Sequence, residues 1–464
     1  MTLRRPVWVL HVFVVGLALH NLAMAELWKA GVRGASLTVV AAWKEALLAA
    51  ALVGVIAARR RLPVERLAVD WLALAYGALI VLYALIPQSA LGGGATHKGV
   101  LYGLRHDLVP VGAYFLGRGL ELTEREVRRL GQTIVATAAG VAAFGLVDVY
   151  AIPLSWWRRS GAAGWFEHQL GFAYQGLSGL PENFVYNTGN ERPLRRLVST
   201  FLSPLATSYL LVVALIFCAA WWARRRPRGI SLLVWCGAVA LLLAGLLWTH
   251  SRSSYLALAL GLGLYALAVR ARRRSDRLEL AAAAAALLAA AALFVHVYPQ
   301  IGPTTTFTPR ELAYQRSNAA RAGPAVTGAE DSSLSSHWRS LRSGVATVLH
   351  QPQGFGLGNA GSTAARTHVA IKAGESTYTE LGVESGLAGA VAFVAWAVAL
   401  LAGVLRCWPW IGAALAAMLA LGLQTDIVGV PWVAYVVWAL AGAAVTSLQQ
   451  ERRTAVAAEM QALP

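Results

Sequence analysis

The fold of this chain is decided by apolar stretches such as residues 230–248, whose sequence is ISLLVWCGAVALLLAGLLW. The stretch has no charged residue and approaches the roughly 20 apolar residues that a bilayer-crossing helix needs. A short polar turn, Thr249–Ser254, follows it, and a second apolar stretch runs from Tyr255 to Val269. Two such stretches joined by a short turn predict two neighbouring membrane-spanning helices.

The same pattern recurs along the whole chain. Of its 464 residues, 57% are hydrophobic and 14% are charged, and the mean hydropathy is +0.55. This composition is far from that of a soluble domain. The sequence therefore predicts an all-α integral membrane protein with about twelve transmembrane helices. The predicted spans are Val7–Trp28, Ala35–Ala58, Leu67–Ile86, Val100–Leu116, Gln132–Tyr150, Leu205–Trp222, Ile230–Trp248, Tyr255–Val269, Leu280–Tyr298, Gly386–Leu405, Trp410–Leu423 and Val428–Thr446.

Clusters of arginine predict the orientation of these spans. Short basic loops stay on the cytoplasmic side, so both termini are expected in the cytoplasm and Val7–Trp28 is expected to remain as an uncleaved first span. The net charge of +17 is accounted for by this topology signal and by attraction to anionic lipid headgroups, without a nucleic-acid partner. The clusters expected on the cytoplasmic side are Arg4-Arg5, Arg59–Arg61, Arg125 with Arg128-Arg129, Arg224–Arg226, Arg272–Arg274 and Arg452-Arg453.

The predicted spans divide the chain into three parts. Residues 1–298 hold helices 1–9 with an external segment at about 152–204, and residues 386–464 hold helices 10–12 and a cytoplasmic tail. Between them, residues 299–385 form a large external loop, with a helix expected over Leu334–Leu349 and extended chain over Gly302–Pro309. Loops of this length are usually functional or disordered, and the glycine and basic residues of this one favour function.

Arginines on the external side are candidates for phosphate binding, because a guanidinium group presents forked hydrogen-bond donors. Arg252 lies in the turn Thr249–Ser254, where a lipid-linked phosphate would reach the membrane surface. Arg195 and Arg196 precede the span that begins at Leu205. The alternative is that these arginines form salt bridges with external acidic residues or contact lipid headgroups.

Charged residues inside predicted spans are a second group of candidates. Arg105 and Asp107 are expected to be buried within Val100–Leu116, and ionisable groups at membrane depth are often functional. The alternative is a structural ion pair in the interior of the bundle. Lys44 and Glu45 are expected to pair with each other.

His337, in the sequence Ser336-His337-Trp338-Arg339, is the candidate catalytic base. A neutral imidazole can take a proton from a sugar hydroxyl because its pKa lies near neutral pH. Arg339 is expected to lower the pKa of His337 through its charge. The alternative is that His337 packs against Trp338 or hydrogen-bonds the acceptor.

No metal site is expected from the sequence. It has no HExxH motif, no Asp-x-Asp motif and no external carboxylate cluster of the kind that Mg²⁺ needs. The three cysteines, Cys218, Cys236 and Cys407, lie in or beside spans, which predicts packing residues and neither a disulfide framework nor a metal site.

Four motifs together resemble the O-antigen ligase/polymerase superfamily of bacterial membrane enzymes. They are RLVSTFLSP at 196–204, SR at 251–252, PQGFGLG at 352–358 and ESGLAG at 384–389. The order of the spans and the large late loop are also similar, and the resemblance covers about half of the chain. One departure is that Glu375-Ser376 stands nine residues before Glu384, where the family often has His-Asn.

The resemblance implies an inverting, metal-independent glycosyltransferase without a cofactor, in the bacterial inner membrane with its site facing the periplasm. Its donor would be a glycan on undecaprenyl diphosphate, and its acceptor, for a ligase, lipid A–core oligosaccharide. His337 looks like the base of the ligases, and Arg252 with Arg196 or Arg195 looks like the diphosphate-binding group. Arg105 and Arg339 are further candidates for binding the diphosphate.

Three alternative functions remain open from the sequence. An O-antigen polymerase would use the same lipid donor but commonly has two large arginine-bearing loops, whereas here the second loop is clearly the longer. A pilin oligosaccharyltransferase of the same superfamily would transfer the glycan to a protein side chain. A transporter of lipid-linked glycans is disfavoured, because few charged residues lie within the predicted spans.

Overall fold

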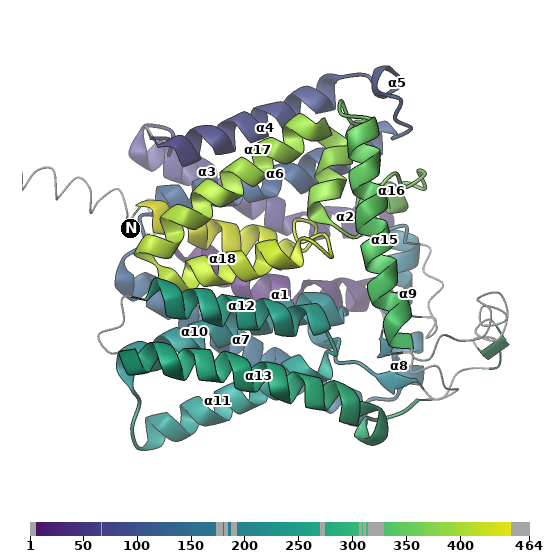
Figure 1. The fold of residues 1–464 in the computed structure, drawn as a ribbon. Coiled ribbons are helices and arrows are strands. Elements are labelled where there is room, and N and C mark those ends of the chain that lie inside the picture. Colours follow the sequence, from purple (N-terminus) through teal and green to yellow (C-terminus); the bar gives the residue numbers. More distant parts are fainter. Residues whose placement is uncertain are drawn as a thin grey trace, which may run out of the picture.

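The computed structural model describes residues 6–446 except 66, 173–179, 181–183, 187–192, 270–273, 306–308, 310–311 and 314–328. Long helices lie side by side in one bundle (Figure 1). Their bounds are α1 (Trp8–Lys29), α2 (Gly34–Ala41), α3 (Trp43–Arg59), α4 (Ala68–Leu85), α6 (His97–Leu120), α7 (Glu124–Ala151), α10 (Pro204–Arg225), α11 (Ile230–Trp248), α12 (Arg252–Ala268), α13 (Arg274–Ile301), α17 (Thr377–Cys407) and α18 (Pro409–Leu421). A last helix, Val433–Thr446, begins with the π-helical turn η3 (Val433–Val437).

The composition of these helices confirms a multi-pass membrane protein. Eight helices in the described part are long and apolar enough to cross a membrane, with α2 and α3 counted together as Gly34–Arg59. Three shorter apolar helices, Arg252–Ala268, Pro409–Leu421 and Val433–Thr446, occupy further predicted spans. The remaining predicted span is α6, which has 24 residues but carries several charged side chains and an internal Pro110. The number twelve therefore stays a prediction.

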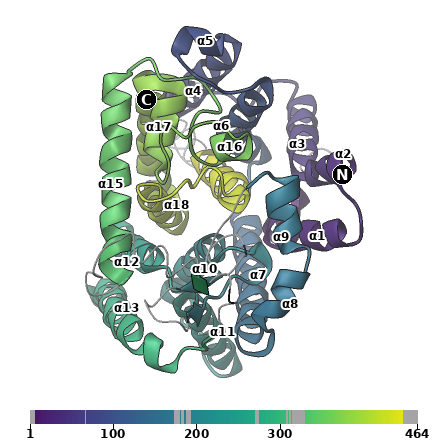
Figure 2. The same cartoon turned by 90° about the vertical axis from the view of Figure 1, so that its right-hand side faces the viewer.

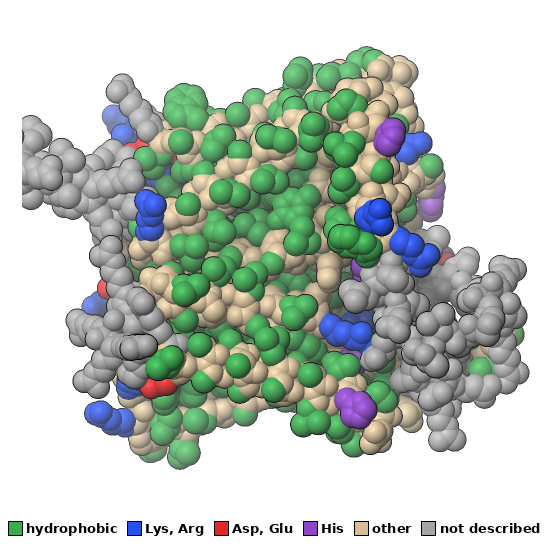
Figure 3. All heavy atoms as spheres, in the orientation of Figure 1, with side chains coloured by type: hydrophobic (Ala, Val, Ile, Leu, Met, Phe, Trp, Pro, Cys, Tyr) green, Lys and Arg blue, Asp and Glu red, His purple; other side chains and the backbone are tan. Residues whose placement is uncertain are grey.

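The surface has the distribution expected of a membrane protein. A band of hydrophobic side chains covers the middle of the bundle, and lysine and arginine gather towards its two ends (Figure 3). Leu233 and Val234 on α11 and Val391 on α17 are among the large apolar residues left exposed. A bilayer covers such a band, because its hydrocarbon core is as apolar as these side chains.

Small residues and one buried ion pair hold α6 against its neighbours. Gly117 on α6 contacts the backbone carbonyl of Ala439, so any side chain at 117 would separate the two helices. Arg118, buried one residue further, donates from Nε and Nη2 to the two carboxylate oxygens of Asp70 on α4, at 2.9 and 2.8 Å. This buried, bidentate ion pair joins α6 to α4 inside the bundle, which indicates a structural role.

Short elements cover one end of the bundle (Figure 2). The predicted helix Leu334–Leu349 is confirmed as α15 (Ala329–His350), which runs across this end from the side of α12 and α13 to the side of α17. The other short elements are α5 (Gln88–Leu91), α8 (Leu154–Arg159), α9 (Ala162–Gly164), η1 (Trp165–Gln169), β1 (Val185–Tyr186), β2 (Leu194–Arg195), η2 (Ser199–Phe201) and α16 (Gly361–Arg366).

The two long segments that the sequence predicts to be external join each other at this end. Strands β1 and β2 pair antiparallel, and Leu194 also bridges to Thr304 of the later segment. The amide of Arg195 donates to the carbonyl of Pro303 at 2.9 Å. The bridge at Thr304 agrees with the extended chain expected over Gly302–Pro309, but Pro309 itself is helical, so the prediction is wrong there. Residues 306–308 of that prediction, and the tail after residue 446, lie outside the described residues.

Candidate active site

His337 and Glu375 form a hydrogen-bonded dyad at the end of the bundle covered by α15. The Nδ1 atom of His337 lies 3.0 Å from Oε2 of Glu375, and both side chains are partly exposed, at 40% and 48%. The carboxylate accepts from Nδ1–H, which leaves Nε2 as the nitrogen that can accept a proton. The hydrogen bond to Glu375, followed by its negative charge, raises the pKa of His337 against the opposing effect of partial burial. The pKa of His337 is therefore raised, where a lowering by Arg339 was expected, and the contacts with Glu375 decide the direction.

Glu375 is held by an unusual backbone conformation and by two side chains of α15. Its backbone has a φ of +67°, which is uncommon for a residue with a side chain and is found where surrounding structure enforces it. The hydrogen bonds from His337 and then from Ser340 lower the pKa of Glu375, although partial burial acts in the other direction. Because His337 and Ser340 are three residues apart on α15, they lie on one face of that helix.

The dyad was not predictable from the sequence. His337 and Glu375 are 38 residues apart, and Glu375 occupies a position where the resemblance gave no role to a glutamate. The sequence offers one indication of Glu375, which is that an acidic residue stands where the family often has histidine.

Glu384 joins the two glycine-containing motifs into one unit. Its Oε1 accepts from the amides of Gly358 at 2.9 Å and Ala360 at 3.3 Å and from the hydroxyl of Thr363 at 2.8 Å. Gly358 has a φ of +85°, and a Cβ there would lie 2.6 Å from the carbonyl carbon of Gly99 on α6. This position therefore needs glycine for both its backbone angle and its close approach to α6.

A kink in α17 completes this unit. Ser385 and Gly386 leave the helical conformation, with φ +70° at Gly386. The segment 352–358 is hydrogen-bonded to α17 on both sides of this kink. The amide of Phe355 donates to the carbonyl of Val383 at 2.7 Å, and the amide of Leu387 donates to the carbonyl of Pro352 at 2.8 Å. The segment that carries Glu375 is thus anchored on a membrane helix.

Arg196 and Arg252 are brought together around His250. Arg196 donates to the carbonyls of Thr249 at 2.9 Å and His250 at 3.4 Å, and Arg252 donates to the hydroxyl of Tyr186 at 2.8 Å. Burial, and after it the charges of Arg196 and Arg252, lower the pKa of His250 to about 3. His250 is 4% exposed, and neither of its ring nitrogens has a partner among the described residues. We name Arg196, His250 and Arg252 the Arg252 site.

Arg195 lies in a different environment from its neighbour. Its guanidinium is buried and donates to Asp148 at 3.1 Å and to the carbonyl of Ile152 at 2.9 Å. The same carboxylate accepts from the indole of Trp157 at 2.5 Å. These contacts tie β2 to the end of α7, so they favour a structural role for Arg195.

The other predicted residues are placed apart from the Arg252 site. Arg105 pairs with Glu45 at 3.5 Å, and Glu45 also pairs with Lys44 at 3.5 Å, as expected for Lys44. The expectation that Arg105 is buried is wrong, because its side chain is 42% exposed, whereas Asp107 is fully buried. Arg339 lies exposed on α15, two residues after His337.

His106 links α6 to the loop after α18, a contact that the sequence pattern did not predict. Its Nδ1 lies 2.7 Å from Asp107 and its Nε2 lies 2.8 Å from Asp426. Asp107 therefore pairs with its neighbour in sequence and not with Arg105. An imidazole between two carboxylates is suited to hold α6 against the loop of Asp426, and both of its nitrogens are occupied.

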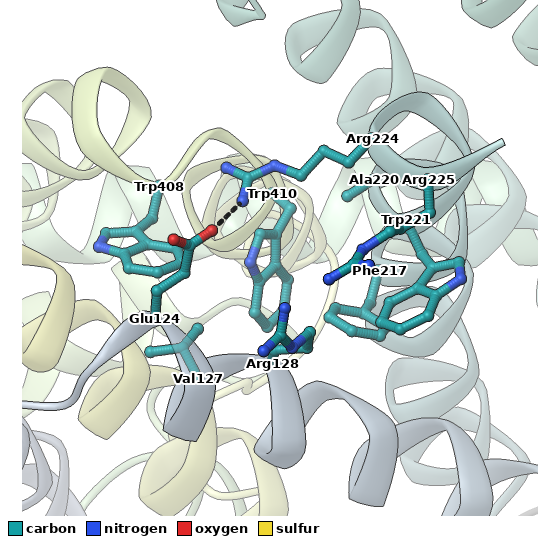
Figure 4. A pocket seen from close by; sticks show the side chains of 10 residues that line it. All are labelled: Glu124, Val127, Arg128, Phe217, Ala220, Trp221, Arg224, Arg225, Trp408 and Trp410. Carbon is teal, nitrogen blue, oxygen red and sulfur yellow. Dashed lines mark hydrogen bonds and ion pairs between the residues drawn. The ribbon is translucent and has the colours of Figure 1, made fainter.

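A cavity of about 200 Å³ lies at the opposite end of the bundle (Figure 4). It is lined by Trp221, Trp408 and Trp410 and by an ion pair between Glu124 and Arg224 at 3.0 Å. Tryptophan and arginine together are typical of a membrane–water interface. The cavity lies apart from the dyad and the Arg252 site, so we assign it no part in the chemistry.

The described residues contain no group of three or more His, Cys, Asp or Glu side chains arranged to hold a metal ion. What the site offers is a histidine–glutamate dyad and a pair of arginines, at one end of a membrane bundle.

These features define a multi-pass membrane protein with a histidine–glutamate dyad and a pair of arginines at one end. A family model described as O-Antigen ligase matches residues 237–394, which confirms the predicted resemblance to the O-antigen ligase superfamily. The matched segment includes Arg252, His337, Glu375 and the motif that begins at Glu384. No curated protein matches the chain.

Proposed function

We propose that this protein transfers an O-antigen glycan from undecaprenyl diphosphate to a sugar hydroxyl of lipid A–core, on the periplasmic face of the inner membrane. The observation that carries the proposal is the His337–Glu375 dyad, which lies inside the segment matched by the O-antigen ligase family. A ligase needs a base for the acceptor hydroxyl and cations for a diphosphate leaving group, and the dyad and the Arg252 site supply these two groups.

In the proposed reaction, Nε2 of His337 takes the proton of the acceptor hydroxyl as its oxygen attacks the anomeric carbon. The bond from that carbon to the phosphate oxygen breaks, and its electrons leave with undecaprenyl diphosphate. Attack opposite to the leaving group inverts the anomeric configuration. The protonated imidazole is stabilised by Glu375 until it releases the proton to water.

The dyad tunes His337 for this role. Because Glu375 raises the pKa of His337, the imidazole is a stronger base than one without a carboxylate partner. A base works best when its pKa is near the working pH. The Nδ1–H bond to Glu375 also fixes the tautomer in which Nε2 is unprotonated.

The Arg252 site is suited to a diphosphate. Arg196 and Arg252 both lie close enough to His250 to lower its pKa, which means that their charges act on the same small region. Fixed cations stabilise the charge that develops on a leaving group without a metal. His250 stays neutral there, so only one of its two unpartnered ring nitrogens carries a proton, and we propose that this N–H donates to a phosphate oxygen.

An apolar cavity of about 480 Å³ supports the proposal of a lipid-linked donor. It lies between α10, α11, α12 and α13, and its lining includes Leu247, which directly precedes the Trp248–Thr249 end of α11. The small side chains of α13, among them Ala283, Ala286 and Ala290, make the space. We propose that the isoprenoid chain occupies this cavity while its diphosphate lies at the Arg252 site.

Lipopolysaccharide from a strain that lacks this gene tests the function. Intact lipid A–core without a ladder, together with accumulated lipid-linked polymer, is the result expected for a ligase. Core capped with a single repeat unit would show that the protein is a polymerase.

A further inference from the structure

A second group of cations surrounds Tyr102 on α6, and the proposed donor site does not use it. The ring centroid of Tyr102 lies 4.4 Å from the guanidinium of Arg366, 5.7 Å from that of Arg105 and 5.5 Å from Nζ of Lys98. Lys98, Tyr102 and Arg105 share one face of α6, because they are four and three residues apart. Cations over an aromatic face are attracted by the ring, and several around one ring repel each other.

The charges of this group are not balanced. Arg105 and Lys44 both pair with Glu45, each at 3.5 Å, and no ion pair of Arg366 or Lys98 is found within the part of the chain that the structure describes. We name Lys44, Glu45, Lys98, Tyr102, Arg105 and Arg366 the Tyr102 cluster. Its four cations and one carboxylate give it a net charge of about +3.

Structural needs alone do not account for these cations. Lys98 lies in the first turn of α6, where the helix dipole disfavours a positive charge. Burial and then the neighbouring Arg105 lower the pKa of Arg366 to about 10, so its guanidinium stays charged at neutral pH at a free-energy cost. An anion among these groups would remove that cost.

The cluster lies where the two external segments meet. Nε of Arg366 donates to the carbonyl of Leu170 at 3.2 Å, which leaves the forked Nη atoms for another acceptor. The ring of Phe172 lies 6.0 Å from the same guanidinium. Residues from α3, α6, α16 and the loop after η1 thus form its walls.

Two features separate the Tyr102 cluster from the Arg252 site. Helices α6 and α16 lie on one side of the covered end of the bundle, and the start of α12 lies on the other (Figures 1 and 2). The cluster is instead connected to the dyad, because α16 and the segment of Glu375 are joined by bonds from Gly361 to the carbonyl of Ala373 at 2.8 Å and from Lys372 to that of Asn359 at 3.1 Å.

We propose that the Tyr102 cluster binds a phosphate group of the acceptor glycolipid and so presents the acceptor hydroxyl to His337. The inference rests on the proposed ligase function, because it needs a second substrate besides the diphosphate-linked donor. The donor's diphosphate has its own pair of arginines, so a second, separate cationic site calls for a second anion. Forked guanidinium groups and an ammonium match the oxygens of a phosphate monoester.

Acceptor binding without donor tests the proposal. The protein is placed in phosphatidylcholine nanodiscs, and the Kd for lipid A–core is measured with its phosphates present and after their enzymatic removal. We expect Arg105→Gln and Lys98→Gln each to raise the Kd for the phosphorylated acceptor by roughly tenfold, the size of one lost charged hydrogen bond. Neither change should alter the Kd for the dephosphorylated acceptor or for the lipid-linked donor.

Lys372→Gln is the matched control. Lys372 is exposed on the same segment as Arg366, and its ammonium lies over the ring of Phe355, outside the Tyr102 cluster. It removes the same charge and should leave all three Kd values unchanged. Lys98→Gln also guards against misfolding, because the loss of a cation from the first turn of a helix favours the helix.

Three results would overturn the proposal. A weaker donor Kd in Arg105→Gln would assign the cluster to the diphosphate. An equal loss for both acceptors would exclude phosphate recognition. Acceptor binding by the unaltered protein that is lost in phosphatidylglycerol discs, without dependence on the acceptor's phosphates, would assign the cluster to a bilayer headgroup. A failure of the proposed ligase function would be told apart from these results, because the unaltered protein would then show no transfer.

Discussion

His337 donates from Nδ1 to Glu375, so Nε2 is the nitrogen that would take the acceptor's proton. His337→Ala should slow transfer by about 10²–10⁴-fold, the usual contribution of a general base. The Kd for the lipid-linked donor should not change, because the arginines remain. His337→Gln keeps a hydrogen-bonding side chain but cannot take a proton, so near-normal transfer by this variant would reduce His337 to a positioning residue.

Glu375→Gln should move the pH dependence of transfer. Glu375 raises the pKa of His337, and the base works only when it is neutral, so in the unaltered protein the rate falls as pH drops through that raised pKa. Without the carboxylate the pKa returns towards its ordinary value, and the acid limb should shift to lower pH. The maximal rate should also fall because the tautomer is no longer fixed.

The rate of transfer measured against pH checks this prediction, with Glu167→Gln as a control that removes an exposed carboxylate elsewhere on the external side. An acid limb that stays in place in Glu375→Gln would show that the limb does not report His337.

Arg252→Lys tests the fork of the guanidinium as distinct from its charge. The variant keeps the cation but loses the second donor and the contact with the hydroxyl of Tyr186, so the Kd for the lipid-linked donor should rise by roughly tenfold or more. Arg196→Ala should have a similar effect. Donor binding by Arg252→Ala and Arg196→Ala at the level of the unaltered protein would remove the diphosphate from this site.

The candidate residues differ in how far the sequence could predict them. Motifs are enough to nominate His337, Arg196 and Arg252 as candidates, because each stands in a short local pattern of sequence. Glu375 and Arg366 act through contacts between segments that are far apart in the chain, and spacing does not encode such contacts. The spacing of Lys98, Tyr102 and Arg105 puts them on one helical face. The sequence does not show that this face is part of a cationic cluster, because that depends on Arg366 packing against Tyr102.

Helices α10 to α13 are the elements that would hold the donor's isoprenoid chain. Ala286→Trp should fill part of the cavity of about 480 Å³ and raise the Kd for the lipid-linked donor several-fold, while donors with a shortened isoprenoid chain should be less affected. Ala285→Trp is the control, because Ala285 is exposed on α13 but does not line the cavity. If the two tryptophan variants raise the donor Kd equally, or if neither raises it, a lipid chain in this cavity is contradicted.

The elements themselves were predicted well where apolar length decides them. Helices α1, α4 and α11 agree with the predicted spans within a few residues, because a bilayer-crossing segment must satisfy its backbone hydrogen bonds internally. Helix α6 shows the limit of this argument. Its charged face towards the Tyr102 cluster lowers its hydropathy, and its place in the bundle comes from close packing at Gly117 and from the Arg118–Asp70 pair.

At the scale of the whole molecule, the proposed function requires the dyad and both cationic sites to face the periplasm. The arginine clusters predict that the opposite end of the bundle lies in the cytoplasm. Two exposed residues test this orientation at opposite ends of the bundle. Ile371 is 55% exposed near Glu375, and Ser231 is exposed at the start of α11. In a background without the three native cysteines, Ile371→Cys should react with a membrane-impermeant thiol reagent in intact spheroplasts.

Ser231→Cys should react only after the spheroplasts are lysed, which makes it the matched control for access. The short basic loops keep their side of the membrane because arginine is costly to move across it, so the two labelling patterns should be opposite and not mixed. If Ile371→Cys reacts only after lysis while Ser231→Cys reacts in intact spheroplasts, the molecule is inverted. The dyad would then face the cytoplasm, where it could not act on a periplasmic donor and acceptor.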